Sequence, residues 1–361
     1  MTDSPMPREI SERIHKMRHD LGRSLDGVKK IYLDTKFWLI LRDCELGRIR
    51  DPVAHELLTL LRLGKKDKRL ICPAEQTVIM EVMRQTDTAT RLKTARLIDQ
   101  LSSGVVIQPI QERLTEELGG LIYRSTGRSD QPTRHFVWTK MGFSFGEMFP
   151  NDEWLPSNLQ EDLRNYMLDQ MWNAKLEDML TDIEAAPWTK NAYDEMADKL
   201  NKGIHDHAHE AKSYSATYRS ELHGSIRGQH SQIADVMSAA YFDDYGVAPD
   251  TSSITSDDLE RHLAFIAEIA LQKEEVKRDL PTSHIQALCH AAHRMEKTRD
   301  LTGNDILDFH HASAAIGYCD AFFTEKALAN LLTQPRFEIE KVFGCSIISR
   351  VSKAVEWLYQ F

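Results

Sequence analysis

Three acidic residues stand where their carboxylates could bind a metal ion. Asp34 directly follows the apolar run 31–33, which predicts a buried strand. Glu81 lies between apolar residues in a predicted helix. Asp308 is expected in the first turn of another helix, where the helix dipole favours negative charge. A hard divalent cation such as Mg²⁺ prefers a few carboxylates with water and phosphate oxygens, so the three acids together predict a metal site.

The elements around the first two acids alternate between strands and helices. Strands are predicted over residues 29–34, 69–73 and 104–109, and helices over 76–85, 91–101 and a segment starting at 52. The last of these begins with Asp51, a capping residue type, followed by Pro52 in the first turn. The alternation predicts an α/β fold with a mostly parallel sheet, in which the carboxyl ends of the strands line one crevice.

The alternation stops in the middle of the chain and then resumes. Residues 113–280 are polar and mostly helical in pattern, with loops expected at 125–149 and 246–256. After residue 281 we predict helices over 283–297, about 305–316 and 326–332, and strands over 319–324 and 345–349. The predicted organisation is an N-terminal helix (1–28), a first α/β half (29–112), a helical insertion (113–280) and a second α/β half (281–361).

Three segments resemble the motifs of PIN-like domains. The run Ile31-Tyr-Leu-Asp34-Thr35 is similar to the first motif, Pro73–Val82 to the second, and Asp308–Thr324, with alanines at offsets 4 and 7 from the Asp, to the third. The resemblance covers about residues 29–112 and 281–361. It implies a three-layer α/β/α fold with a central, mostly parallel sheet, interrupted by the helical insertion.

The resemblance also implies an activity. PIN-like domains are typically Mg²⁺- or Mn²⁺-dependent nucleases that act mostly on RNA, so we expect a metal-dependent nuclease, in the first place an endoribonuclease. A metal-activated water would hydrolyse the phosphodiester bond. Carried over by position, Asp34, Glu81 and Asp308 become the metal-binding, catalytic acids.

The sequence departs from the family pattern at three positions. Lys36 stands where an Asn is frequent, Glu75 where a Ser or Thr opens the second motif, and Lys326 where the fourth acid is usual. Asp320 or Glu325 could supply the missing charge, and we choose Asp320, because it begins a strand beside the expected site. Two alternatives therefore stay open: a degenerate domain that binds nucleic acid or protein without cleaving, and a nuclease acting on DNA.

Other candidate residues have simpler interpretations. His205 and His209 have the i,i+4 spacing of metal ligands, but a surface helix face explains them better. His311 could face the phosphate or pack at the edge of the sheet. The aromatic residues of segment 138–149 could stack on bases, although a loop that folds them inward is the stronger interpretation.

Composition limits the class of protein. The formal net charge of −10 over 361 residues argues against coating of nucleic acid, so a nuclease would need a local basic path. Lysines and arginines suited to such a path occur at 29–30, 65–69, 124, 128 and 134. Five dispersed cysteines and a polar start without an apolar segment behind it favour a cytoplasmic protein without a membrane span. We expect the insertion to cover the crevice or to bind a protein partner or a second copy.

Overall fold

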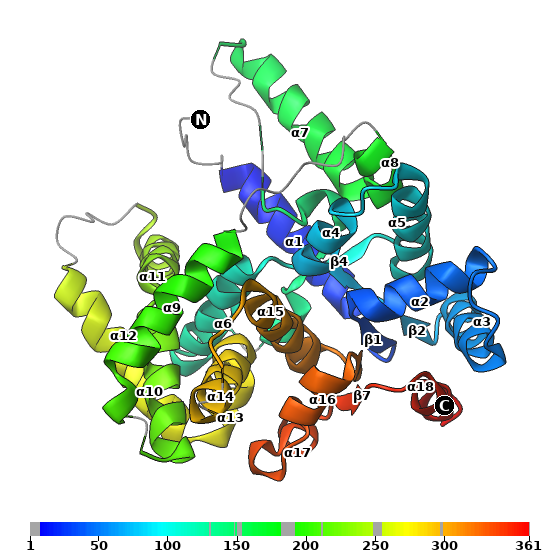
Figure 1. Cartoon of the computed structure of the whole chain (residues 1–361). Helices are drawn as coiled ribbons and strands as arrows, with labels where there is room; N and C mark the ends of the chain where they lie inside the picture. Colours follow the sequence, from blue (N-terminus) through cyan, green and yellow to red (C-terminus); the bar gives the residue numbers. More distant parts are fainter. Residues whose placement is uncertain are drawn as a thin grey trace. The chain divides into compact units, whose positions relative to one another are not determined.

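The computed structural model describes residues 8–129, 131–147, 149, 154–181, 192–210, 212–247, 255–296 and 299–360. The chain has an α/β fold, as predicted (Figure 1), and divides into two compact units. Unit 1 comprises residues 1–109, 134–187 and 350–361, and unit 2 comprises 110–133 and 188–349. Residues 281–349 therefore group with most of the predicted insertion, while residues 134–181 of that insertion group with the first α/β half.

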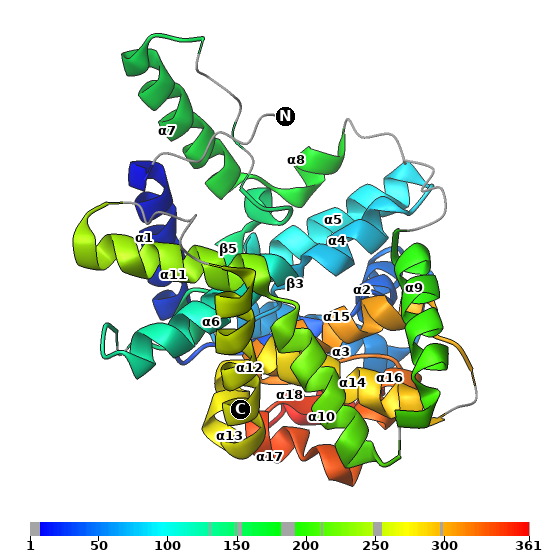
Figure 2. The same cartoon turned by 90° about the vertical axis from the view of Figure 1, so that its left-hand side faces the viewer.

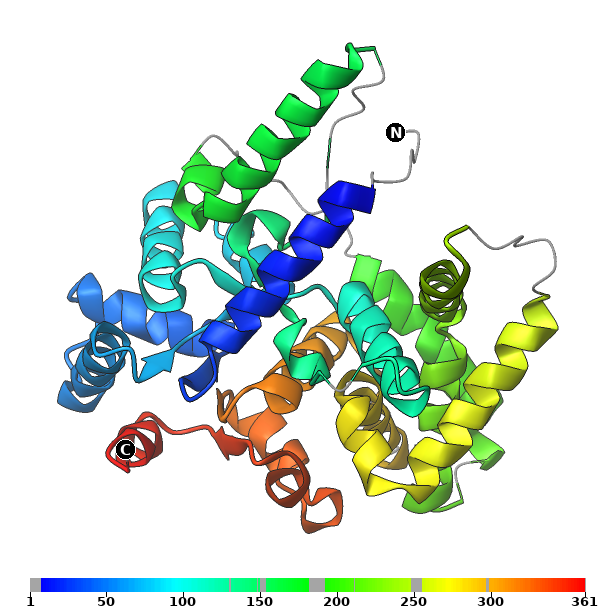
Figure 3. The same ribbon diagram turned by 180° about the vertical axis from the view of Figure 1, so that it is seen from behind.

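Unit 1 contains short strands and longer helices. In chain order they are α1 (Arg8–Ser24), β1 (Lys29–Leu33), α2 (Thr35–Glu45), α3 (Pro52–Lys66), β2 (Leu70–Ile71), β3 (Ala74–Glu75), α4 (Gln76–Met83), α5 (Thr88–Ser102), β4 (Val105–Ile107), β5 (Trp138–Lys140), the 3-10 turn η2 (Met141–Phe143), α7 (Ser157–Asn173), α8 (Leu176–Thr181) and α18 (Val351–Leu358). Helix α18 packs beside α3, as Figures 1 and 3 both show.

Two parallel strand pairs form in unit 1. Strand β1 pairs with β2, and β3 pairs with β4. The apolar side chains of β1 are fully buried, which confirms the strand predicted to precede Asp34. Strand β5 pairs antiparallel with β4, with Thr139 opposite Val106, inside the segment predicted to be a loop. The loop prediction was wrong there, because a three-residue strand shows almost no periodicity of its own and depends on the neighbouring strand for its hydrogen bonds.

Unit 2 is mostly helical. Its elements are α6 (Ile110–Ser125), α9 (Ala192–Asp206), the 3-10 turn η3 (Ala208–Glu210), α10 (Tyr214–Arg227), α11 (His230–Tyr245), α12 (Ser256–Gln272), α13 (Glu274–Asp279), α14 (Pro281–Glu296), α15 (Gly303–Tyr318), β6 (Ala321–Phe323), α16 (Lys326–Leu332), the 3-10 turn η5 (Pro335–Phe337), α17 (Ile339–Phe343) and β7 (Ser346–Ile348). The short 3-10 turn η1 (Thr133–His135) lies where the chain passes from unit 2 to unit 1.

Helix α14 explains why the second α/β half groups with the insertion. It packs against both α10 and α15, and α15 packs against α9 (Figure 2). Eleven of its sixteen residues are buried, so both of its faces need apolar partners. Strands β6 and β7 pair in parallel, with Phe322 opposite Ile347. Much of the predicted loop 246–256 lies outside the described residues.

Capping side chains begin the helices at the predicted sites. The Asp51 carboxylate accepts a hydrogen bond from the Val53 N–H at 3.0 Å and Pro52 opens α3, as predicted. At the start of α15, Thr302 and Asp305 form a reciprocal capping box. Asp305 is therefore the acid of the first turn, and Asp308 lies one turn further along, which corrects its predicted position. None of the helices in the described parts of the chain is long and apolar enough to cross a bilayer.

Candidate functional site

Asp34 occupies the junction between β1 and α2. Its backbone is extended, with φ −70° and ψ 170°, and its side chain accepts a hydrogen bond from the Phe37 N–H at 3.2 Å. The residue is only 6% exposed. Asp34 thus caps α2 at the carboxyl end of β1, where the helix dipole and the backbone N–H groups stabilise the charged form of a carboxylate.

Glu81 reaches the same junction from α4. The Thr35 hydroxyl donates a hydrogen bond to its carboxylate, and α2 and α4 pack against each other. Thr35 directly follows Asp34, and consecutive Cα atoms are about 3.8 Å apart. The hydrogen bond to Thr35 therefore places the Glu81 carboxylate near Asp34. Unit 1 therefore gathers two of the four predicted acids. The sequence places Thr35 in the first motif but indicates no role for its hydroxyl.

Glu75 accounts for one departure from the family pattern. It is 1% exposed, and its carboxylate accepts a hydrogen bond from the Thr77 N–H at 2.6 Å, which caps α4. A Ser or Thr would make the same cap with a hydroxyl oxygen. The residue at this position therefore starts the helix that carries Glu81. Of the other two departures, Lys36 and Lys326 are both exposed.

The remaining predicted acids belong to unit 2. Asp308 is half-buried in α15, and it adds to the rise in the pKa of the Cys289 thiol that burial causes. Asp320 precedes β6, at the amino end of that strand, and its backbone carbonyl accepts a hydrogen bond from the Ser346 N–H at 3.0 Å. Glu325 follows β6 at the opposite, carboxyl end and is exposed. Because sites in α/β sheets form at carboxyl ends, Glu325 is the better placed of the two alternatives.

The histidines near Asp308 are packed into the fold. His311 is 2% exposed, which agrees with the packing interpretation. Burial lowers the pKa of His310 to about 3, with further lowering from Arg113, so its ring is neutral at physiological pH. The Tyr193 ring contacts His310 edge-on, with centroids 5.6 Å apart.

The other predicted motifs take structural roles. His205 contacts Asp300 at 3.0 Å on the surface, and the described residues contain no group of three or more His, Cys, Asp or Glu suited to a metal ion. The aromatic side chains of segment 138–149 fold inward, with Trp138 2% and Phe143 0% exposed. Arg124 and Arg128, proposed for a basic path, form ion pairs with Asp279 and Asp244.

A further buried carboxylate, in unit 2, was not predicted. Glu117 of α6 is fully buried and accepts hydrogen bonds from the Thr282 N–H, the Thr282 hydroxyl and the Tyr318 hydroxyl. Burial raises its pKa to about 7, although the three donors and the Arg113 guanidinium act in the opposite direction. The sequence offers one weak signal, since Arg113 and Glu117 stand four residues apart, a spacing that usually indicates an exposed helix pair.

The carboxylates of unit 1, Asp34 and Glu81, and the carboxylate of unit 2, Glu117, can do different chemistry. Asp34 lies at the carboxyl end of β1, and the carboxylate of Glu81, which keeps partial exposure, reaches the next residue from α4, so a cation could approach. Mg²⁺ is commonly bound through one or two protein carboxylates with water and substrate phosphates, and this donor set fits that requirement. Glu117 has no exposed surface and cannot serve a dissolved substrate.

Comparison with known protein families, curated proteins and solved structures gives no match to this chain.

Proposed function

We propose that the protein is a metal-dependent nuclease, in the first place an endoribonuclease with a PIN-like α/β/α domain. The observation that carries the proposal is the hydrogen bond between Thr35 and Glu81, which joins the first and second motifs at the carboxyl end of β1. Asp308 is added from the sequence resemblance alone. Asp320 stays a prediction, and its place at the amino end of β6 makes it the weakest of the four acids.

The chain's own residues would prepare the site in three ways. The Phe37 N–H fixes one oxygen of Asp34, and the Thr35 hydroxyl fixes one oxygen of Glu81. The cap formed by Glu75 sets the start of α4 and hence the position of Glu81. A bound Mg²⁺ or Mn²⁺ would activate water and stabilise charge on the phosphate. Preorganised carboxylates of this kind hold a cation with little rearrangement.

The test is cleavage of labelled single-stranded RNA and DNA with Mn²⁺ or Mg²⁺, with EDTA as a control. Asp34→Asn is the sharpest variant, because asparagine caps helices as well as aspartate and only the charge is lost. We expect it to reduce cleavage about 100-fold or more. Asp51→Asn is the matched control, since Asp51 caps the next helix of the same unit, and it should leave cleavage unchanged. Equal activity of the two variants would refute the proposed site.

Two observations favour the alternative of a non-catalytic binding module. The described residues contain no cluster of three or more metal-binding side chains, and the exposed Lys326 replaces the usual fourth acid. Under that alternative the wild-type protein binds RNA without cutting it, and calorimetry detects no binding of Mn²⁺. Cleavage of DNA but not RNA would instead keep the chemistry and change the substrate.

A further inference from the structure

Basic side chains lie at the amino ends of three strands of unit 1. Lys29 and Lys30 begin β1, and the basic run 65–69 extends from the last turn of α3 to the start of β2. Strand β5 is antiparallel to β4, so Lys140 lies opposite Val105, the first residue of β4. We call these cations the basic surface, and its members are Lys29, Lys30, Lys65, Lys66, Lys68, Arg69 and Lys140.

Contacts between these elements bring the members together. The Lys29 N–H donates a hydrogen bond to the Arg69 carbonyl at 2.9 Å, which joins the start of β1 to the run before β2. The Lys140 amino group donates to the Ser103 carbonyl at 2.9 Å. Burial lowers the pKa of this amino group, and the positive charge of Lys65 lowers it further. Lys65 and Lys140 are therefore close enough to repel each other, although they lie beside different strand pairs.

Carboxylates leave much of this charge unbalanced. Asp67 contacts Arg69 at 3.4 Å, and Asp26, which precedes β1, contacts the His135 ring at 3.1 Å. Within the part of the chain that the structure describes, no ion pair involves four members of the surface, which are Lys65, Lys66, Lys68 and Lys140. Like charges that lie close together without acids repel one another, and a bound polyanion relieves that repulsion.

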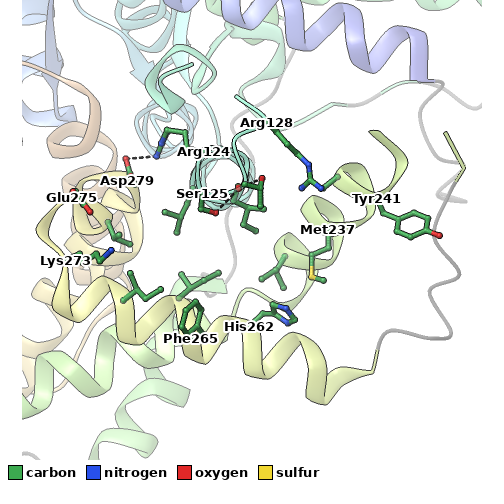
Figure 4. Close-up of a pocket in the computed structure, with 18 of the residues that line it drawn as sticks. Arg124, Ser125, Arg128, Met237, Tyr241, His262, Phe265, Lys273, Glu275 and Asp279 are labelled. Atoms are coloured by element: carbon green, nitrogen blue, oxygen red, sulfur yellow. Dashed lines mark hydrogen bonds and ion pairs between the residues drawn. The ribbon is translucent and has the colours of Figure 1, made fainter. Parts of the chain in front are cut away.

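The pocket of unit 2 has a different charge balance. It measures about 890 Å³ and lies between α6, α11, α12 and α13 (Figure 4). Its lining includes three cations and three carboxylates, which are Arg124, Arg128, Lys273, Asp244, Glu275 and Asp279. The charges of this pocket therefore select neither an anion nor a cation, whereas the basic surface of unit 1 selects an anion.

The basic surface and the proposed acids lie at opposite ends of β1. The five residues of β1 rise about 3.3 Å each, so Lys29 and Asp34 are roughly 17 Å apart. Nucleic acid carries one phosphate per about 3.4 Å of each stacked strand, so about five stacked nucleotides cover this length. A chain of phosphates can therefore contact both ends of the strand, which a single small anion cannot do.

We propose that the basic surface is a second contact site for the RNA backbone, which anchors the substrate strand at a distance from Asp34 and Glu81. The identity of the polyanion rests on the proposed nuclease function. Cations spread over several elements suit a row of phosphates, whereas a single phosphate needs donors that converge on one point. Contacts with phosphates carry no sequence information, so the binding is independent of base sequence and sensitive to salt.

The first test measures binding without cleavage, by fluorescence anisotropy of a labelled RNA of about 20 nucleotides in EDTA. The triple variant removes three members of the surface that have no ion pair and is Lys65→Gln/Lys66→Gln/Lys68→Gln. We expect about tenfold weaker binding. The slope of log affinity against log salt should decrease in magnitude by about 2, because each phosphate contact contributes about 0.7.

The control variant removes three exposed lysines of α1, α5 and α9 and is Lys16→Gln/Lys93→Gln/Lys202→Gln. It changes the net charge by the same amount and should bind RNA like the wild type. Thermal unfolding confirms that both variants fold. Equal binding by the triple variant and the control, or no RNA binding by the wild type, would overturn the proposal. Tighter binding of anionic lipid vesicles than of RNA would assign the surface to a membrane and also overturn it.

Cleavage kinetics separate this proposal from the proposed function. With Mn²⁺ and the long RNA, the triple variant should raise KM about tenfold at unchanged kcat, because the surface binds the substrate equally before and during reaction. Cleavage of a trinucleotide, which is too short to contact both ends of β1, should not change. RNA binding that depends on the surface, without any cleavage, would keep this proposal and refute the nuclease. Cleavage with KM unchanged in the triple variant would keep the nuclease and refute the second contact site.

Discussion

A threonine hydroxyl donates a hydrogen bond to a glutamate in each unit, and the two glutamates have different surroundings. In unit 1, Glu81 accepts from Thr35, beside the capping residue Asp34, and stays partly exposed. In unit 2, Glu117 accepts from Thr282 and from Tyr318 and has no exposed surface. The same pair of residue types thus occurs once at a strand end and once inside a helical core.

The difference separates a carboxylate that could serve a ligand from one that holds the fold together. A buried carboxylate with three donors satisfies those donors, and its removal leaves them without a partner in an apolar environment. A partly exposed carboxylate beside a strand end, such as Glu81, can be reached by a cation. Four experiments test this contrast.

The largest expected effect is the loss of the Glu117 carboxylate. Glu117→Ala leaves the Thr282 N–H and the Thr282 and Tyr318 hydroxyl groups without their acceptor and removes the negative charge near Arg113, and we expect the free energy of unfolding to fall by about 3–5 kcal/mol. Urea denaturation measures it. Glu112→Ala, a half-buried residue of the same helix, should change stability by less than about 0.5 kcal/mol. Similar values for both variants would contradict the structural role.

The next effect is a pH dependence of stability. The pKa of Glu117 is about 7 in the fold and 4.5 ordinarily, so between these values the folded state binds more protons than the unfolded state. The contribution of Glu117 to the free energy of unfolding should therefore fall by about 3 kcal/mol as pH rises from 4.5 to 7, and level off above.

The difference between wild type and Glu117→Gln isolates this contribution, because glutamine does not titrate. Burial lowers the pKa of His284 and His310 to about 3, so these rings make stability rise with pH from about 3 to 6.5, and they cancel in the difference. Urea denaturation of both proteins from pH 4.5 to 8 measures it. Parallel curves would show that Glu117 does not titrate in this range.

A smaller effect is expected when Glu81 loses its donor. Thr35→Val keeps the shape of the side chain and removes the hydroxyl that orients Glu81, so we expect kcat/KM for RNA cleavage to fall about tenfold with little change in stability. Thr59→Val is the control, because the Thr59 hydroxyl donates to the His55 carbonyl within its own helix, α3. If Thr35→Val instead lowered stability and left activity unchanged, Thr35 would have a structural role, like that of Thr282 in unit 2.

The smallest effect separates two acids of α15. Asp305 forms the capping box with Thr302, so Asp305→Ala should lower the free energy of unfolding by about 1 kcal/mol and leave cleavage unchanged. Asp308→Asn should do the reverse and reduce cleavage at nearly constant stability. Thermal unfolding and the RNA assay, performed on both variants, measure the contrast. Reduced cleavage by Asp305→Ala would place the functional acid one turn earlier.

Most elements could be predicted because their signals are local. The helix at Pro52 and the capping box at Thr302 depend on residues within four positions of each other, and the buried strand before Asp34 is visible in its composition. The predicted range 326–332 coincides with α16 for the same reason. Strand β5 was missed because its pairing partner, not its own three residues, makes it a strand.

The candidate site was predictable only in part. The sequence identified Asp34 and Glu81 through their motifs, but the hydrogen bond from Thr35 to Glu81 joins residues 46 positions apart. It also suggested the first turn of α15 for Asp308, whereas the capping box places Asp305 in that turn. The local sequence does not distinguish an acidic side chain that only caps the start of a helix from one that also faces a ligand.

The sequence by itself determined the α/β class, the positions of most helices and the caps that start them, since these follow from short-range periodicity and hydrogen bonding. The tertiary structure alone decided which carboxylate is sealed from water. Glu117 meets Thr282 and Tyr318 across 165 and 201 residues, and its desolvation is a sum over such distant neighbours. Tertiary packing likewise grouped α14 and α15 with the predicted insertion and formed the pocket between α6 and α12. Burial is a property of the whole environment of a side chain, and no window of sequence contains that environment.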